Sequence, residues 1–265
     1  MEKNIIFQNS SIFYRVVGEG KTVILIHGFP LNGDIFDSQV DYLKGHCKLI
    51  IPDLPGCGKS APIENINIEI LAELIKEIIN NEQSIDGSES KATIIGHSLG
   101  GYAVLAFAEK YPQYLDAFGL FHSTAFADTE EKKQGREKAI NLINEKGSLA
   151  FATGNIPGLF TKSFAEQNQP LIDSSIESAG GFKASTLVHY QQAMMVRPNR
   201  TDVLKSFPKP ILFIIGEHDN GIPLQDSLQQ CYLPAQSHVH ILSNSAHMGM
   251  FEETEKANHF ISEFL

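Results

Sequence analysis

Gly96-His97-Ser98-Leu99-Gly100-Gly101 is the stretch that decides the fold, because it joins a buried strand to a helix of small residues. The apolar run 92–95 predicts the strand. The Ala- and Gly-rich run 99–111, which ends at Pro112, predicts the helix. Glycine on both sides of Ser98 lets the backbone turn sharply and lifts the hydroxyl above the sheet. We therefore expect a strand-to-helix elbow with Ser98 as a candidate nucleophile.

On both sides of this elbow, short apolar runs alternate with longer helical patterns. This alternation is typical of the α/β class, in which helices cover both faces of a mostly parallel sheet. We expect a hairpin from residues 5–8 and 11–17, followed by buried strands at 23–26, 47–51, 92–95, 117–121, 211–215 and 239–242. Helices of the core are expected at 67–80, 99–111 and 252–265.

The stretch 124–205 breaks this rhythm, since it shows helical patterns such as 130–144 and 185–196 but no clear buried strand. A helical insertion between two strands indicates a cap over the carboxyl edge of the sheet, where ligands bind in open α/β sheets. We therefore divide the chain into a first core part, a cap and a second core part, at 1–123, 124–205 and 206–265.

Composition narrows the possible partners. The 265 residues carry a formal net charge of −10. Nucleic acid is therefore not expected as a partner, because its phosphates require a basic surface. The three cysteines form no C-x-x-C pair, and there is no H-E-x-x-H, so we expect no metal. Neither a leader segment nor a membrane span is predicted, which favours a cytoplasmic protein. We expect a small-molecule substrate and either a monomer or a homodimer.

A serine hydroxyl needs a base to remove its proton and an acid to orient that base. His247 lies in Ser245-Ala246-His247-Met248-Gly249, between the last predicted strand and the final helix, where a base is expected. Asp219 follows the strand 211–215 and is favoured as the acid over Glu217, which stands closer to the strand.

Two backbone N–H groups are candidates for an oxyanion hole. One is that of Leu99, at the positive end of the elbow helix. The other is that of Phe29, in the loop His27-Gly28-Phe29-Pro30 after the strand 23–26. Pro30 has no N–H to offer, which leaves Phe29 as the donor of that loop.

Residues of the cap are expected to set specificity. Phe126 and Met194 are candidates for an apolar substrate pocket. Arg197 and Arg136 are alternatives for binding a substrate carboxylate, because a guanidinium pairs with a carboxylate through two hydrogen bonds. For both arginines a solvated surface position is the other open interpretation.

Five landmarks in order make the sequence resemble the α/β-hydrolase superfamily over nearly its whole length. They are His27–Pro30, Asp53–Ser60, Gly96–Gly101, Gly216–Asp219 and Ser245–His247. The resemblance implies an eight-stranded sheet with a helical cap, a triad of Ser98, Asp219 and His247, and no cofactor. Epoxide hydrolases and haloalkane dehalogenases, whose loop is similar to His27–Pro30, use Asp at the elbow where this chain has Ser98.

The expected activity is therefore hydrolysis of a small carboxylic ester or lactone through an acyl-enzyme on Ser98. Small esterases, enol-lactonase-like hydrolases and haloperoxidase-like enzymes are the branch that the chain resembles. The same triad also supports hydrolysis of a C–C bond or perhydrolysis with peroxide. A non-catalytic ligand-binding member of the fold is a further alternative.

Overall fold

The computed structural model describes residues 1–82 and 91–265. Its strands form one sheet in the order β1-β2-β4-β3-β5-β6-β7-β8. The antiparallel strand β2 pairs with β1 and β4, and every neighbouring pair from β4 to β8 is parallel. The strands are β1 (Glu2–Phe7), β2 (Ser10–Val17), β3 (Thr22–Ile26), β4 (Lys48–Pro52), β5 (Ala92–His97), β6 (Leu115–Phe121), β7 (Ile211–Gly216) and β8 (Ser237–Leu242). The predicted eight-stranded, mostly parallel sheet is thus confirmed.

Alternation of apolar side chains along the central strands builds two cores. On β3, Ile24 and Ile26 face one hydrophobic cluster while Val23 and Leu25 face the other. Successive side chains of a strand point to opposite faces, and both faces are covered here, so the central strands are continuously apolar. The core helices are α1 (Asp37–Leu43), α2 (Ile68–Asn81), α3 (Leu99–Lys110), α9 (Leu224–Cys231), α10 (Gly249–Glu252) and α11 (Thr254–Phe264), with short 3-10 turns η1 (Gly33–Phe36) and η2 (Pro112–Tyr114).

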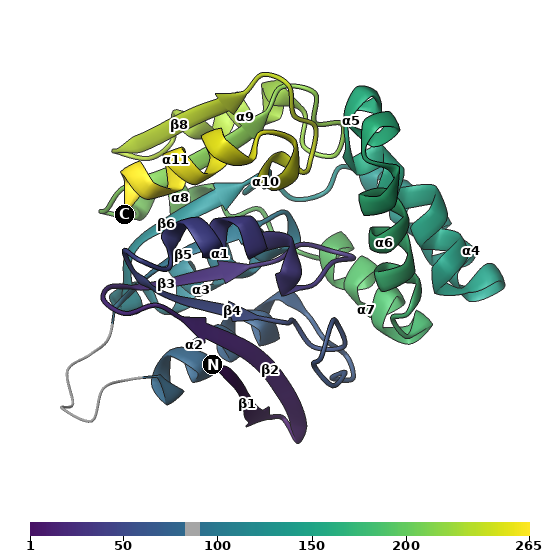
Figure 1. Ribbon diagram of the computed structural model, residues 1–265, viewed down its shortest axis with the longest axis horizontal. Coiled ribbons are helices and arrows are strands. Elements are labelled where there is room, and N and C mark those ends of the chain that lie inside the picture. The colour runs from purple at the N-terminus through teal and green to yellow at the C-terminus, as the bar shows by residue number, and fades with distance from the viewer. Residues whose placement is uncertain (83–90) are drawn as a thin grey trace.

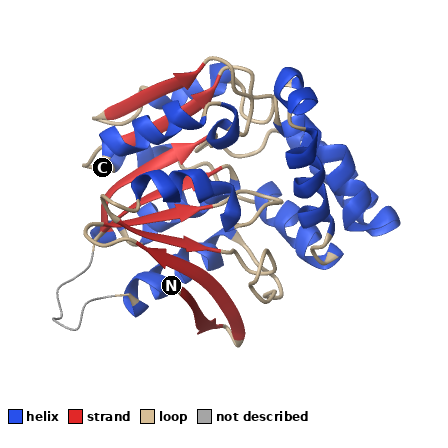
Figure 2. Ribbon diagram, in the orientation of Figure 1, coloured by secondary structure: helices blue, strands red, loops and turns tan. Residues whose placement is uncertain are grey.

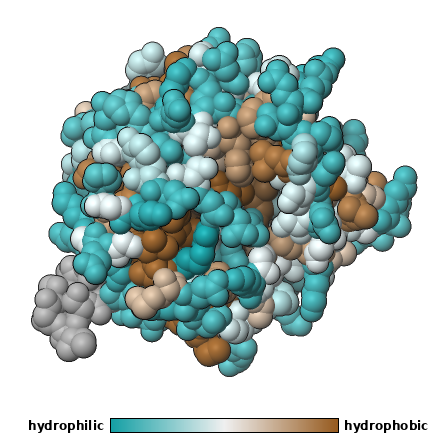
Figure 3. Space-filling view, viewed as in Figure 1, coloured by the Kyte–Doolittle hydropathy of each residue, from teal (hydrophilic) through white to brown (hydrophobic). Residues whose placement is uncertain are grey.

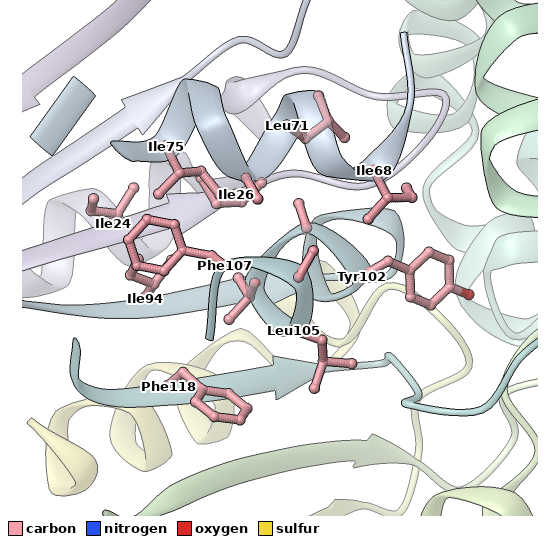
Figure 4. Packing of buried hydrophobic residues seen from close by; sticks show 14 of the residues in the cluster. Ile24, Ile26, Ile68, Leu71, Ile75, Ile94, Tyr102, Leu105, Phe107 and Phe118 are labelled. Carbon is pink, nitrogen blue, oxygen red and sulfur yellow. The ribbon is translucent and has the colours of Figure 1, made fainter. Parts of the chain in front are cut away.

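Helices α2 and α3 cover the first face and α1 and α11 the second. Figure 4 shows Ile75 of α2 and Phe107 of α3 meeting Ile24 and Ile94 of the sheet. The predicted helix 252–265 is divided in the structure, because Glu253 leaves the helical conformation between α10 and α11.

The segment between β6 and β7 is helical, and we use the name cap for its residues 124–205. It contains α4 (Glu130–Asn155), η3 (Ile156–Leu159), α5 (Lys162–Gln167), α6 (Gln169–Gly180) and α7 (Ala184–Met195), and α8 (Thr201–Ser206) begins in it and ends one residue beyond it. Helices α4 to α7 lie beyond the carboxyl ends of the parallel strands, which the arrowheads mark (Figures 1 and 2). Helix α4 is longer than the predicted 130–144 and bends at Gly147, whose φ is 82°.

Both ends of the cap meet at the core. The N–H of Arg200 donates to the carbonyl of Ala125 over 2.7 Å, which joins the exit of the cap to its entry. The buried Arg200 guanidinium also binds Glu109 of α3 at 2.9 Å and Glu69 of α2. These contacts fix the root of the cap on the helices of the first face.

Candidate active site

Ser98 lies at the predicted elbow between β5 and α3, with φ of 51° and ψ of −117°. A positive φ is unfavourable for a residue with a side chain, and such strain persists only where neighbouring contacts enforce it. The N–H of Ser98 donates to the carbonyl of Phe121 at 2.9 Å. The Ser98 carbonyl accepts from the N–H of Gly101 and from Ser123 Oγ, at 2.9 and 2.7 Å. The strained turn is therefore held from β6 and from its own helix.

Close packing behind the elbow requires Gly100. A Cβ at this position would lie 2.3 Å from the carbonyl oxygen of Ile26, at the end of β3. Helix α3 can therefore start directly against the sheet only with glycine there. This contact brings the loop that follows β3 beside the elbow.

The loop after β3 is oriented by His27. Its Nε2 accepts the N–H of Leu54 at 2.8 Å, and its Nδ1 lies 2.8 Å from the carbonyl of Gly28, so Nδ1 carries the proton. Burial lowers the pKa of His27, against the charge of Asp53, which raises it. A neutral, doubly bonded imidazole thus holds the loop in place.

The two predicted oxyanion donors belong to the residue after Ser98 and to the loop that packs against the elbow. Leu99 is the first residue of α3, so its N–H has no acceptor within the helix. In the part of the chain that the structure describes, the N–H of Phe29 makes no backbone hydrogen bond. The neighbouring Gly28 packs so closely on the elbow that a Cβ there would be 2.9 Å from Ser98 Cβ.

Asp219 and His247 are brought together by the loops after β7 and β8. His247 Nδ1 lies 2.7 Å from Asp219 Oδ2, while Oδ1 accepts the N–H groups of Gly221 and Ile222 at 2.8 and 2.9 Å. Asp219 is buried, whereas the competing Glu217 is exposed. The structure therefore places the favoured acid, and not its competitor, against the predicted base.

The charge state of Asp219 follows from its partners. Burial alone would raise the pKa of this carboxyl. The charge of His247 and the hydrogen bonds from His122 and His247 outweigh burial and hold the pKa well below its ordinary range. Asp219 is therefore ionised, and it accepts the Nδ1–H of His247.

His122 was not predicted as a site residue. It directly follows β6, has a φ of 48°, and its Nδ1 lies 3.5 Å from Asp219 Oδ2. The N–H groups of Gly216 and Gly249 point at its Nδ1 and Nε2, each over 3.0 Å. A neutral imidazole accepts at one nitrogen only: with Nδ1–H turned to Asp219, Nε2 accepts the N–H of Gly249, which a protonated ring could not do, and burial lowers the pKa of His122 in the same direction. Its position at the carboxyl end of a central strand is the signal that sequence reasoning could have used.

His97 is a second imidazole that supports His247. Its Nε2 lies 2.9 Å from the carbonyl of His247 and donates to it, and the two rings are 5.0 Å apart. Burial and the neighbouring His247 and His122 place the pKa of His97 well below its ordinary value. His122 and His247 thus face the Asp219 carboxylate, and the ring of His97 packs against both of them.

Aromatic side chains of the cap approach the loop of Phe29. The Phe29 ring is 5.8 Å from Phe151 of α4 and 5.9 Å from Tyr190 of α7. The Tyr190 hydroxyl donates to the carbonyl of Pro55 at 2.9 Å, which fixes this side of the cap to the core. Phe126 is half-buried at the entry to the cap. The cap therefore places an apolar surface next to the candidate oxyanion loop.

Arg197 does not occupy either of the positions expected for it. It is 5% exposed, so it is not a solvated surface residue, and its Nη1 lies 2.7 Å from Asp128 Oδ1. The same guanidinium donates to the carbonyls of Met194 and Phe126 and lies 4.0 Å above the ring of Tyr102. The predicted contact with a substrate carboxylate is corrected to an internal one, because Asp128 already pairs with the guanidinium.

Arg136 shares this carboxylate and is also corrected. Its Nε lies 2.5 Å from Asp128 Oδ2, and its Nη1 donates to Gln191 at 3.1 Å and to the sulfur of Met194 at 3.2 Å. Met194 is therefore a buried neighbour of both arginines. The two guanidiniums join the entry and exit of the cap.

The described residues offer no other kind of centre. No group of three or more His, Cys, Asp or Glu side chains among them is placed to hold a metal ion. In the same residues, no helix combines the length and the apolar character that crossing a membrane requires.

The sheet order, the strained serine elbow and the histidine–carboxylate pair at the carboxyl edge define a hydrolase of the α/β class. The profile described as alpha/beta hydrolase fold matches residues 21–254, and the chain belongs to this family. Its expected fold and family are thereby confirmed.

Similar proteins extend over almost the whole chain. A pimeloyl-[acyl-carrier protein] methyl ester esterase of Vibrio vulnificus is 23% identical, over 97% of this chain and 98% of its own length. A thermophilic esterase of Thermogutta terrifontis, solved with malate bound, superposes with a TM-score of 0.91 at 25% identity, covering 100% of this chain and 97% of that one. The enol-lactonase of Burkholderia xenovorans LB400 superposes at 0.89 with 18% identity, covering 99% of each chain, and shows the shared fold.

Proposed function

We propose that this protein is a serine hydrolase that cleaves a small-molecule carboxylic ester or lactone through an acyl-enzyme on Ser98. The observation that carries the proposal is the pairing of His247 with the buried, ionised Asp219 at the sheet edge that also bears the strained Ser98. The names of the esterases to which the chain is similar support ester bonds as the target.

The proposed reaction begins with proton transfer from Ser98. Because Asp219 accepts the Nδ1–H of His247, the Nε2 of that ring is left as the acceptor for the hydroxyl proton. The serine oxygen attacks the carbonyl carbon, and the imidazolium then returns the proton to the leaving alcohol. Water, activated by the same nitrogen, attacks the acyl-enzyme and releases the acid and free Ser98.

In this proposal, the N–H groups of Phe29 and Leu99 donate hydrogen bonds to the negatively charged oxygen of the tetrahedral intermediate and stabilise it. Donors that are already in place need no reorganisation when the charge develops, which is why they accelerate the reaction. The start of α3 adds the partial positive charge of a helix N-terminus at Leu99. No metal or cofactor takes part in the proposed steps.

The cap favours an apolar group on the substrate. Phe151 and Tyr190 pack against Phe29, and Ile143 and Leu187 continue the same apolar cluster. Phe126 and Met194 remain predicted contacts of the substrate. A short or medium acyl chain or a lactone ring fits these surroundings better than a second charged group.

The test is a hydrolysis panel of esters, lactones and thioesters with graded acyl length, run on wild type and Ser98→Ala. Ser98→Ala should lose turnover and labelling by a fluorophosphonate probe while keeping the far-ultraviolet circular dichroism of wild type. Ser163→Ala, which removes an exposed hydroxyl of the cap, is the matched control and should retain both. Turnover that survives in Ser98→Ala would overturn the proposal, as would a wild-type protein that the probe does not label.

A further inference from the structure

The backbone on both sides of His247 is bound by one carboxylate, that of Glu252. Its Oε2 accepts the N–H of Ala246 at 2.9 Å and the N–H of Met248 at 3.2 Å. These two N–H groups belong to the residues that precede and follow the candidate base. Hydrogen bonds to an ionised acceptor are stronger than those between neutral groups, so Glu252 is a firm support for this loop.

The same carboxylate reaches the cap. The N–H of Thr161 donates to Glu252 Oε1 at 2.7 Å. Only two residues earlier in the cap, the carbonyl of Leu159 accepts the N–H of His247 itself at 2.8 Å. Three consecutive N–H groups, from residue 246 to residue 248, are therefore bound either by the cap directly or by a carboxylate that the cap also binds.

This part of the cap is packed into the core rather than lying loosely on it. Ile156 and Phe160 are buried in the second hydrophobic cluster, and the Phe160 ring lies 6.3 Å from Phe251 of α10. In Figure 3, hydrophobic side chains gather along the seam between the cap and the core near α10. Apolar packing therefore fixes the segment from residue 156 to residue 161 on the core together with the hydrogen bonds that it makes.

We propose that Glu252 is a positioning residue that couples the seating of the cap to the orientation of His247. With the cap seated, the loop of His247 is fixed on three consecutive N–H groups, and the ring is held for proton transfer. When the segment from residue 156 to residue 161 lifts, the N–H of His247 loses its acceptor and Glu252 loses its anchor on the cap. The inference rests on the proposed function, because it assigns to His247 the role of base.

Thr161 offers a way to break the connection from the side of the cap, without substituting a residue of the loop. Its φ of −63° is that of a proline, and Phe160 before it has the extended φ and ψ of −109° and 158° that precede proline. In proline the Cδ atom takes the place of the amide hydrogen, so it would face Glu252 Oε1, which now accepts that N–H at 2.7 Å. Thr161→Pro therefore deletes the N–H donor and turns the Glu252 carboxylate away from the cap, and Thr161→Ala is the matched control that keeps the N–H.

The two variants are compared by steady-state hydrolysis and by the rate of fluorophosphonate labelling. Thr161→Pro should lower kcat about 10- to 100-fold, with KM within about twofold of wild type, because misplacing a catalytic group by a fraction of an ångström to one ångström costs rate in this range. The labelling rate should fall in parallel, and Thr161→Ala should match wild type. Loss of stability alone would leave kcat per folded molecule unchanged.

A second pair of variants decides the matter if Thr161→Pro fails to fold. Glu252→Gln replaces one of the two carboxylate oxygens that accept the three N–H groups by an NH₂ group, which cannot accept them. Glu253→Gln is the control: its carboxylate binds Asn244 in the same loop but has no hydrogen bond to the cap among the described residues. Glu252→Gln should show the same loss of kcat and of labelling rate, and Glu253→Gln should stay within about threefold of wild type.

The outcomes separate the two proposals. An active, labelled wild type with equal kcat in Thr161→Pro and Thr161→Ala, or in the two glutamine variants, overturns the coupling while the proposed function stands. A wild type without turnover or labelling overturns the proposed function itself.

Discussion

Replacing Asp219 by asparagine is the change that most directly tests the proposed base. The variant keeps the shape of the side chain, and its amide oxygen still accepts the N–H groups of Gly221 and Ile222, as Oδ1 does over 2.8 and 2.9 Å. What it loses is the acceptor for His247 Nδ1–H, which Oδ2 provides at 2.7 Å. The amide NH₂ now faces Nδ1 and favours the tautomer in which Nε2 carries the proton.

The magnitude follows from that tautomer. With a proton on Nε2, His247 has no lone pair for the hydroxyl of Ser98, and the developing imidazolium has no carboxylate beside it. A wrong tautomer in a triad of this kind lowers kcat about 10⁴-fold, which corresponds to about 5.5 kcal/mol of activation free energy. The KM should change little, because Asp219 is buried and its carboxylate binds His247.

The assay is kcat for the best ester of the panel, together with the rate at which the fluorophosphonate labels Ser98. Both should fall together in Asp219→Asn, with thermal unfolding used to show that the protein is folded. Glu217→Gln removes an exposed carboxylate two residues away and should keep wild-type rates. An Asp219→Asn variant within tenfold of the wild-type kcat would refute the assignment of Asp219 as the acid.

Further predictions concern stability and the oxyanion loop. Gly28→Ala should lower stability by about 1–3 kcal/mol in urea unfolding and reduce kcat, because the new Cβ would lie 2.9 Å from Ser98 Cβ. Arg197→Met should cost about 3 kcal/mol in the same assay, since it breaks a buried ion pair with Asp128, and wild-type stability in that variant would contradict the pairing. The pKa of Asp219 is lowered in the folded state, so its carboxylate stabilises the fold above about pH 4, and this stabilisation is lost as the pH falls below that value. Asp219→Asn should therefore lose less stability than wild type on acidification from about pH 5 to about pH 2.

Much of the fold was readable from the sequence because local patterns and the final packing agree. The apolar runs at β3, β5 and β7 are covered on both faces, so no other arrangement satisfies them as well. The lengths of the helices were harder to predict. Helix α4 continues past residue 144, through a bend at Gly147, to Asn155.

The candidate site was readable where a residue type stands at the end of a strand. Ser98, Asp219 and His247 each follow β5, β7 or β8 within a few residues, so a parallel sheet puts all three at the same edge. His122 follows β6 in the same way, but a histidine there has no fixed role in the pattern, and only its 3.5 Å approach to Asp219 reveals one.

Contacts of the cap could not be inferred, because they join residues that no local pattern relates. Arg197 looked available to a substrate until the fold placed Asp128, about seventy residues earlier in the chain, against its guanidinium. Glu252 looked like an ordinary acidic residue of a terminal helix, yet its two oxygens bind the loop of His247 and the N–H of Thr161. Both cases have the same physical cause: a buried or half-buried charge takes whichever partners the tertiary structure supplies, since leaving it unpaired is costly. The proposed orientation of His247 therefore depends on contacts with the cap, whereas the proposed chemistry depends on residues at the ends of the strands.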